Sequence, residues 1–215
     1  MGLDRKYLDN KENQNAESLR IARNVAKKRI DIISIEDGID FSILEDFCRV
    51  MKKINIFIWC SKLQLLDIMK FFIEEKGCLF EPLVWNKTNP TPSTNNSWLP
   101  DLEYCLYFRE KGVPLNDGYD LKKKCFISPA NVNDKDKFNH PTIKPLELVK
   151  KHILHTTQPN DIVVDFFMGS GTTCVASKDT GRRYLGFEIS EKWFNVAQDR
   201  LNQTDANGQT SMFLV

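Results

Sequence analysis

The clearest chemistry in this sequence lies in residues 161–188. An apolar run leads to the carboxylate of Asp165, Gly169 and Gly171 follow it, and Glu188 closes the stretch. Glycines let the backbone turn sharply and approach a ligand closely. A helix that begins after them offers unpaired N–H groups to a polar or anionic group. We therefore expect an adenosine-type cofactor here, with Glu188 accepting hydrogen bonds from two ribose hydroxyls.

Several kinds of ligand compete for such a loop. The dinucleotide fingerprint G-x-G-x-x-G needs a third glycine, but Val175 and Ala176 occupy that neighbourhood. A P-loop needs Gly-Lys-Ser/Thr, which the sequence lacks. Asp165 would repel a pyrophosphate but suits a cationic methionine group, so the chemistry favours S-adenosylmethionine. Two alternatives stay open at this point: a glycine turn without a ligand, and a dinucleotide-dependent oxidoreductase.

The elements that position this loop follow from the apolar pattern. Apolar runs of strand length favour buried strands, and apolar residues at helical spacing favour helices. We predict helices at 16–28, 41–51, 63–75, 145–155, 172–180 and 191–201. We predict strands at 54–60, 79–85, 102–108, 162–167 and 184–189, and loops at 86–100 and 112–139. This alternation predicts a doubly wound, mostly parallel α/β sheet with ligands beyond the carboxyl ends of its strands.

Three motifs in this order resemble one family, the beta-group DNA amino-methyltransferases, which act on adenine N6 or cytosine N4. The family's D-P-F-x-G-S-G-T-T stands here as DFFMGSGTT over residues 165–173, with Phe166 in place of proline. Its H-P-T-x-K-P stands as HPTIKP over 140–145. GFEISEKWFNVAQDR over 186–200 is similar to its G-x-E-(I/L)-x-x-x-Y-x-x-x-A-x-x-R. Residues 85–92 and 101–112 resemble the strand and hairpin before its target-recognition region.

The resemblance covers residues 40–201 and implies a Rossmann-like, S-adenosylmethionine-dependent methyltransferase fold in circularly permuted order. It implies that the loop contacts the methionine end of the cofactor and that Glu188 holds the ribose. It also implies that residues 140–145 close over the cofactor. The cofactor residues it implies are Asp165, Phe167, Gly169, Ser170, Gly171, Thr172, Thr173, Glu188, Ile189, His140, Pro141, Thr142, Lys144 and Pro145. A simple turn before a helix is the alternative interpretation of His140 and Pro141.

The family's catalytic motif, (D/N/S)-P-P-(Y/F/W), is missing. Its aromatic ring stacks on a base that has left the duplex. The chain contains no Pro-Pro dipeptide, and Ser128-Pro129-Ala130-Asn131 is a poor substitute in the wrong segment. We expect the motif and the two strands around it to lie upstream of Met1, so that the chain is a truncated product. The alternatives are a partner polypeptide that supplies the motif, and a degenerate methyltransferase that binds cofactor or DNA without chemistry.

Sheet and domain organisation follow from this interpretation. A sheet without its two central strands would expose apolar faces of 54–60 and 162–167, which invites association. With 215 residues, 41% of them apolar, the chain suits one α/β domain. We divide it into an N-terminal remnant (1–37), the catalytic half (38–112), a short recognition loop (113–139), the cofactor-binding half (140–203) and a tail (204–215).

Composition excludes several other classes. No apolar run approaches the ~20 residues of a membrane span, and the polar start does not suit a signal peptide. Six scattered cysteines without a C-x-x-C pair, and three histidines without acidic partners, argue against disulfides and metal sites. We expect a cytoplasmic protein encoded by a bacterium, a phage or a mobile element.

DNA is the expected partner, although the net charge is only +1. The candidate DNA contacts are Lys87, Asn95, Asn96, Trp98, Lys122, Lys123 and Lys124. Lysines mostly contact phosphates, which positions a protein without specifying a sequence, and a solvated loop is the alternative for all of them.

The expected function is methylation of an exocyclic amino group in DNA, adenine N6 ahead of cytosine N4, within restriction-modification. A homodimer or a partner subunit is possible.

Overall fold

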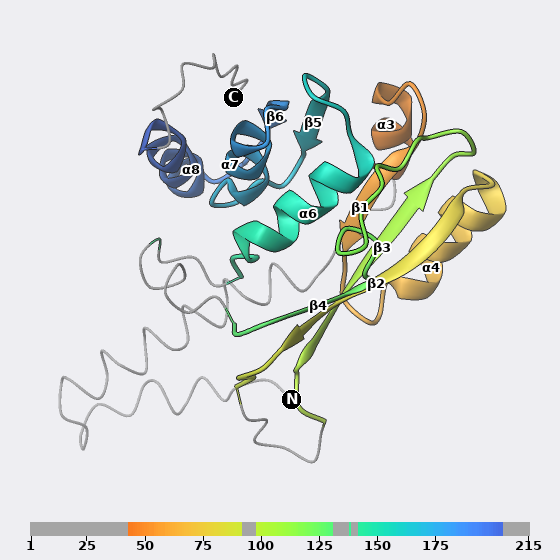
Figure 1. Cartoon of the computed structure of the whole chain (residues 1–215), viewed down its shortest axis with the longest axis horizontal. Helices are drawn as coiled ribbons and strands as arrows, with labels where there is room; N and C mark the ends of the chain where they lie inside the picture. Colours follow the sequence, from red (N-terminus) through yellow and green to blue (C-terminus); the bar gives the residue numbers. More distant parts are fainter. Residues whose placement is uncertain (1–42, 92–97, 131–137, 139–141, 204–215) are drawn as a thin grey trace, which may run out of the picture. The chain divides into compact units, whose positions relative to one another are not determined.

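The structure is a computed structural model that describes residues 43–91, 98–130, 138 and 142–203, all within one compact unit (Figure 1). The helix predicted at 16–28 lies outside the described residues. The helical elements are α3 (Ile43–Val50), α4 (Leu65–Met69), a π-helical segment (Lys70–Glu75), α6 (Leu146–Thr156), α7 (Thr172–Asp179) and α8 (Glu191–Gln203). The strands are β1 (Asn55–Trp59), β2 (Leu79–Lys87), β3 (Leu102–Arg109), β4 (Cys125–Ser128), β5 (Ile162–Asp165) and β6 (Arg183–Gly186).

The larger sheet has the strand order β1-β3-β2-β4. β3 is antiparallel to both β1 and β2, with Tyr107 opposite Phe57 and Cys105 opposite Leu83, whereas β4 is parallel to β2. β1, β2 and β4 therefore share one direction and β3 alone is reversed. The expectation of a mostly parallel sheet holds for the strand directions but is wrong for the pairings around β3. The connection 88–101 contains no described helix, and a parallel return would need a crossover element.

β4 is a strand that the pattern of 112–139 did not predict. Its four residues pair in parallel with β2, and flanking main-chain bonds join Val84 N–H to the Lys124 carbonyl (2.9 Å) and Thr88 N–H to the Ser128 carbonyl (3.0 Å). The Trp85 indole N–H also donates to the Ser128 hydroxyl at 2.9 Å. A run of four residues beside three lysines carries too little apolar pattern to indicate a strand.

The second sheet consists of β5 and β6, which pair in parallel. The helices α7 and α8 pack with it around Met168, Cys174, Val175, Tyr184, Ala197 and Leu201. β5 is less buried than its apolar sequence predicts, because Ile162 is 51% exposed and Val164 37%. No helix among the described residues is long and apolar enough to cross a membrane.

Side chains connect the two sheets. The His152 ring of α6 stacks on Phe57 of β1, with centroids 4.6 Å apart and the planes 3° from parallel. The Asn55 amide nitrogen donates to the Thr156 carbonyl at 2.9 Å. On the other side, the Phe47 ring of α3 stacks on Phe166, just beyond β5, at 4.5 Å. Helix α6 therefore packs on β1 and also contacts α7 beside the second sheet, and α3 contacts the end of β5.

Candidate functional site

The loop between β5 and α7 has the geometry of a tight strand-to-helix turn. Gly169 and Gly171 have φ values of 51° and 78°, in the left-handed region that favours glycine. The Gly171 N–H donates to the Met168 carbonyl at 2.7 Å, and the Met168 N–H donates to the Phe187 carbonyl at 3.0 Å. A Cβ on Gly171 would lie 2.8 Å from the Ala197 Cβ, so a side chain at this position clashes with α8. The sequence expectation of a glycine-dependent turn is confirmed.

Asp165 lies at the carboxyl end of β5. Its Oδ1 accepts the Phe167 N–H at 3.0 Å, and the Thr173 hydroxyl also hydrogen-bonds to the carboxylate. Burial raises the pKa of Asp165 above its ordinary value; these two hydrogen bonds lower it, and the Glu188 charge raises it further. A partly buried carboxylate whose ionised form is disfavoured is stabilised by a cation placed beside it. The site therefore suits a positively charged group.

Glu188 lies just beyond β6 and connects the loop with the second strand. One carboxylate oxygen accepts the Gly169 N–H at 2.9 Å, and the other accepts the Ser190 N–H at 2.8 Å. A carboxylate oxygen has two lone pairs, so each can accept a further hydrogen bond from a ligand. Asp165 and Glu188 are also close enough for their charges to interact. The structure thus brings together two carboxylates that are separated by a whole strand–helix–strand unit in the sequence.

Two apolar side chains beside these carboxylates face outward. Phe167 is 59% exposed and Ile189 is fully exposed. The first turn of α7 lies next to them, and its leading N–H groups have no intrahelical acceptor in an α-helix. The site therefore combines apolar surface, main-chain donors and two carboxylates.

Arg200 is a functional candidate that the sequence analysis missed. It is buried, and its Nη1 donates to the Ser170 carbonyl (2.6 Å), the Ser170 hydroxyl (3.1 Å) and the Thr172 hydroxyl (3.1 Å). Both Ser170 and Thr172 are themselves buried. The last position of the motif at 186–200 was the available signal, because it places an arginine on the same helix as Ala197.

The HPTIKP segment is described only in part. His140 and Pro141 lie outside the described residues, Thr142 is exposed, and Pro145 is the N-cap of α6. The Lys144 Nζ lies 2.8 Å from the Glu103 carboxylate and 5.1 Å from the centre of the Trp59 ring. In this structure Lys144 therefore contacts the larger sheet, and its predicted role at the cofactor stays a prediction.

The candidate DNA contacts carry less free charge than their sequence predicts. Lys87 pairs with Glu103 at 2.7 Å, Lys123 with Asp120 at 2.7 Å, and Lys124 with Glu81 at 2.5 Å. Lys122 pairs with Asp117. These partners neutralise much of the basic patch.

Glu103 itself is shared between Lys87 and Lys144. Burial raises its pKa, but the two ammonium groups outweigh burial and hold the pKa of Glu103 below its ordinary value. The side chain of Trp98 is 96% exposed, and Asn95 and Asn96 lie outside the described residues.

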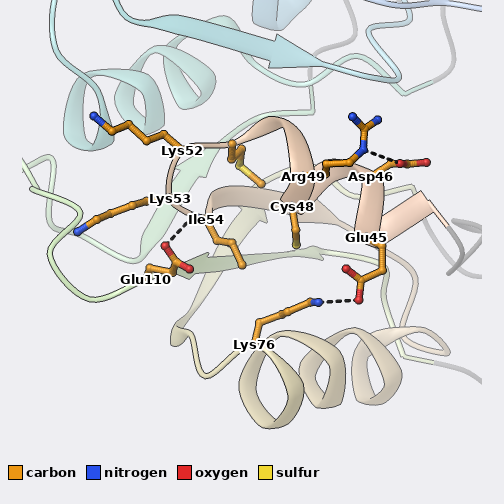
Figure 2. Close-up of a pocket in the computed structure, with 10 residues that line it drawn as sticks. Glu45, Asp46, Cys48, Arg49, Lys52, Lys53, Ile54, Lys76 and Glu110 are labelled. Atoms are coloured by element: carbon orange, nitrogen blue, oxygen red, sulfur yellow. Dashed lines mark hydrogen bonds and ion pairs between the residues drawn. The ribbon is translucent and has the colours of Figure 1, made fainter.

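A cavity of about 480 Å³ lies elsewhere, beside α3 and the ends of β1 and β3 (Figure 2). Figure 2 shows that four of its charged side chains pair, Lys76 with Glu45 and Arg49 with Asp46. It shares no residue with the loop, Asp165 or Glu188. No group of three or more His, Cys, Asp or Glu side chains that could hold a metal ion occurs in the described ranges. The loop therefore remains the candidate site on chemical grounds.

Comparison with known proteins identifies the family. The DNA methylase family matches residues 40–199, most of the chain. The chain belongs to this DNA methylase family. It is 29% identical over 170 residues to the type II methyltransferase M2.LlaDCHI of Lactococcus lactis subsp. cremoris, covering 72% of this chain and 63% of that protein. It is 28% identical over 146 residues to M.HinfI of Haemophilus influenzae, covering 60% and 41%.

Solved structures agree with this DNA methylase assignment. The M1.HpyAVI–SAM complex is 34% identical with a TM-score of 0.65, covering 75% of this chain and 83% of that one. The cytosine-N4-specific PvuII DNA methyltransferase, at 18% identity and a TM-score of 0.57, shares the fold. The predicted α/β methyltransferase fold is confirmed. The matched part of the chain spans less than two thirds of the length of the Lactococcus and Haemophilus relatives.

Proposed function

We propose that this chain binds S-adenosylmethionine at the loop between β5 and α7. The observation that carries the proposal is the hydrogen bond from the Gly169 N–H to Glu188, which joins the loop to a carboxylate at the end of the neighbouring strand. Ligands of open α/β sheets bind in this position, beyond the carboxyl ends of adjacent strands. The solved M1.HpyAVI relative is a complex with this cofactor.

The polar groups of the loop and of Glu188 fit the chemistry of that cofactor. Asp165, whose pKa is raised by burial, would gain a favourable interaction with the cationic sulfonium and ammonium groups. Glu188 has lone pairs left for the two ribose hydroxyls. The first N–H groups of α7 suit the methionine carboxylate. A pyrophosphate would instead meet the Asp165 carboxylate, which disfavours a dinucleotide.

The remaining predicted residues would complete the cofactor site. Phe167 and Ile189, close to the two carboxylates in the sequence, offer exposed apolar surface. The segment with His140, Pro141 and Thr142 would cover the cofactor, and Pro145 fixes the point where α6 begins. When bound, S-adenosylmethionine supplies an electrophilic methyl group; this chain would bind the cofactor, orient it and exclude water from it.

We infer that the reaction served is methylation of an exocyclic amino group in DNA. The family and the type II methyltransferases among its relatives support this. Adenine ahead of cytosine stays a prediction. Trp98, through its exposed indole, would contact bases. Lys87 and Lys122–Lys124 would contact phosphates after exchanging their carboxylate partners for the backbone.

The transfer step needs a Pro-Pro-aromatic segment that this sequence does not contain. We propose that another segment or a partner polypeptide supplies it beside β5. Among the described residues β5 pairs only with β6 and β1 only with β3, so each keeps one edge without a described partner. Unpaired edges with exposed apolar side chains such as Ile162 are favourable places for strand addition. A second candidate function, favoured by the same missing motif, is a binding subunit that holds cofactor or DNA without chemistry.

The test uses the full chain, duplex DNA and S-adenosylmethionine labelled in its methyl group. The chain alone should bind the cofactor and transfer no label, whereas addition of a polypeptide with the Pro-Pro-aromatic motif should start transfer. Nucleoside analysis then distinguishes N6-methyladenine from N4-methylcytosine. Label transfer by the chain alone would refute the need for a partner. Cofactor binding without transfer, in the presence of any motif-bearing family member tested, would favour the binding subunit.

A further inference from the structure

Helix α8 packs directly against the back of the glycine loop. A Cβ at Gly171 would lie 2.8 Å from the Ala197 Cβ and 3.2 Å from its Cα, so loop and helix touch with no space for a side chain. Ala197 is completely buried at this contact. One turn further along α8 lies Arg200, on the same face of the helix.

Arg200 binds the loop through three oxygen atoms. Its Nη1 lies 2.6 Å from the Ser170 carbonyl oxygen and 3.1 Å from each of the Ser170 and Thr172 hydroxyl oxygens. The Gly171 N–H, at the other end of the Ser170–Gly171 peptide unit, donates to the Met168 carbonyl at 2.7 Å. A planar peptide unit that is held at both its carbonyl and its N–H cannot rotate freely.

We propose that Arg200 is a positioning residue for the cofactor loop. By binding the Ser170 carbonyl and both hydroxyls from the α8 side, it directs these oxygens away from the ligand and leaves the first N–H groups of α7 facing it. A charge-assisted bond from a buried guanidinium is roughly twice as strong as a neutral one. The ligand side of this inference rests on the proposed function, because the loop is set in place for S-adenosylmethionine.

Arg200 also contacts Phe138, which lies two residues before the HPTIKP segment. Its guanidinium carbon lies 4.4 Å from the centre of the Phe138 ring, within the range of a cation–π interaction. Phe138 precedes His140 by two residues in the sequence. One side chain thus contacts both the loop and Phe138.

The experiment compares Arg200→Met with Arg200→Lys and with a matched control. The control is Lys178→Met, because Lys178 is another buried cation between α7 and α8, and its Nζ donates to the Leu201 carbonyl at 2.9 Å. Binding of S-adenosylmethionine is measured by calorimetry at a temperature at which circular dichroism shows each variant folded. Amide hydrogen exchange of residues 168–173 is measured without cofactor, and urea unfolding gives the stability of each variant.

Arg200→Met should raise the Kd about tenfold or more, the effect of one charge-assisted hydrogen bond. Arg200→Lys should recover part of this loss. Lys178→Met should lower stability and leave the Kd within about twofold, well inside the effect of one hydrogen bond. Amide exchange in the loop should accelerate in Arg200→Met and not in Lys178→Met.

Wild-type affinity in Arg200→Met, or equal losses in Arg200→Met and Lys178→Met, would overturn the proposal. If the wild-type chain does not bind S-adenosylmethionine, the proposed function fails, and loop exchange still decides on the role of Arg200. Faster exchange in Arg200→Met alone would then support positioning of the loop, and unchanged exchange would refute it.

Discussion

The carboxylate of Glu188 accepts the main-chain N–H of Gly169 at 2.9 Å, nineteen residues earlier in the chain. Its second oxygen accepts the Ser190 N–H at 2.8 Å. A single side chain therefore fixes the start of the glycine loop and the approach to α8, and still has lone pairs for a ligand. Glu188 should consequently contribute both to the stability of the fold and to ligand binding.

Glu188→Gln should lower the free energy of unfolding and weaken the binding of S-adenosylmethionine. The amide NH2 group would face one of the two main-chain N–H donors, and leaving that partly buried donor unsatisfied should cost about 1 kcal/mol of unfolding free energy. S-adenosylmethionine affinity should fall about tenfold, because one acceptor for the ribose is lost. Urea unfolding and calorimetry measure the two effects, with Glu191→Gln in the exposed first turn of α8 as the control. Unchanged cofactor affinity in Glu188→Gln would contradict the ribose role.

Asp165→Asn should stabilise the chain and weaken cofactor binding. Burial raises the pKa of Asp165, so the folded state binds its proton more tightly than the unfolded state does. The ionised carboxylate therefore destabilises the fold as pH rises above the unfolded pKa of about 3.9. Asparagine carries no such penalty and still accepts the Phe167 N–H.

Urea unfolding between pH 4 and pH 8 tests the predicted stabilisation by Asp165→Asn. The advantage of Asp165→Asn over the wild type should grow as pH rises from 4, while its affinity for S-adenosylmethionine at pH 7 should fall. A variant that is less stable than the wild type at pH 7 and binds with wild-type affinity would count against the assigned charge interaction.

His152→Phe should protect the chain against mild acid. Burial, with the charges of Lys151 and His155, lowers the pKa of His152 to about 3. The unfolded state, with a pKa of about 6.5, therefore binds more protons between these values, and the wild type loses stability as pH falls below 6.5. Phenylalanine keeps the stacking on Phe57 without the titration.

The loss of unfolding free energy between pH 7 and pH 5 should be smaller in His152→Phe by up to about 2 kcal/mol, since one pKa unit corresponds to about 1.4 kcal/mol. His152→Gln is the companion variant, since it removes titration and stacking together. Equal pH dependence in the wild type and His152→Phe would show that this ring titrates normally.

Phe166, which replaces the family's proline, should be required for stability. Its ring stacks on Phe47 at 4.5 Å and faces Phe187 at 5.7 Å, nearly parallel to both. Phe166→Pro should lower the free energy of unfolding by about 2–4 kcal/mol, because both aromatic contacts and much of the apolar burial are lost. Phe167→Leu is the control, since its ring is 59% exposed and its loss should change stability by less than about 1 kcal/mol. Equal effects of the two substitutions would show that the stack of Phe166 on Phe47 contributes no more to stability than the edge contact of Phe167 with the same ring at 6.0 Å.

Strong local patterns predicted much of this structure. The helix predicted at 172–180 is α7, Thr172–Asp179, because glycines before it and Gly181 after it mark both ends. The strand predicted at 162–167 ends at Asp165, since Phe166 and Phe167 leave the sheet to enter the turn. Asp165 and Glu188 converge as expected, because the strand–helix–strand unit fixes where each strand ends.

What the sequence did not predict depends on partners distant in the chain. β4 exists only because β2 offers an edge to four residues, and the reversal of β3 depends on its neighbours on both sides. Lys144 belongs to a cofactor motif by resemblance, yet its Nζ lies beside Glu103 of β3. The three oxygens bound by Arg200 could not be inferred either, because an arginine near the end of a polar helix usually faces solvent.

Calorimetric titration of the full chain with S-adenosylmethionine, and separately with NAD, tests the central claim most directly. The wild type should bind S-adenosylmethionine and not NAD, and Glu188→Ala should bind S-adenosylmethionine about tenfold or more weakly, as loss of a charged acceptor predicts. Binding of NAD alone, or equal affinity of the wild type and Glu188→Ala for S-adenosylmethionine, would contradict the assignment of this loop as a methyl-donor site.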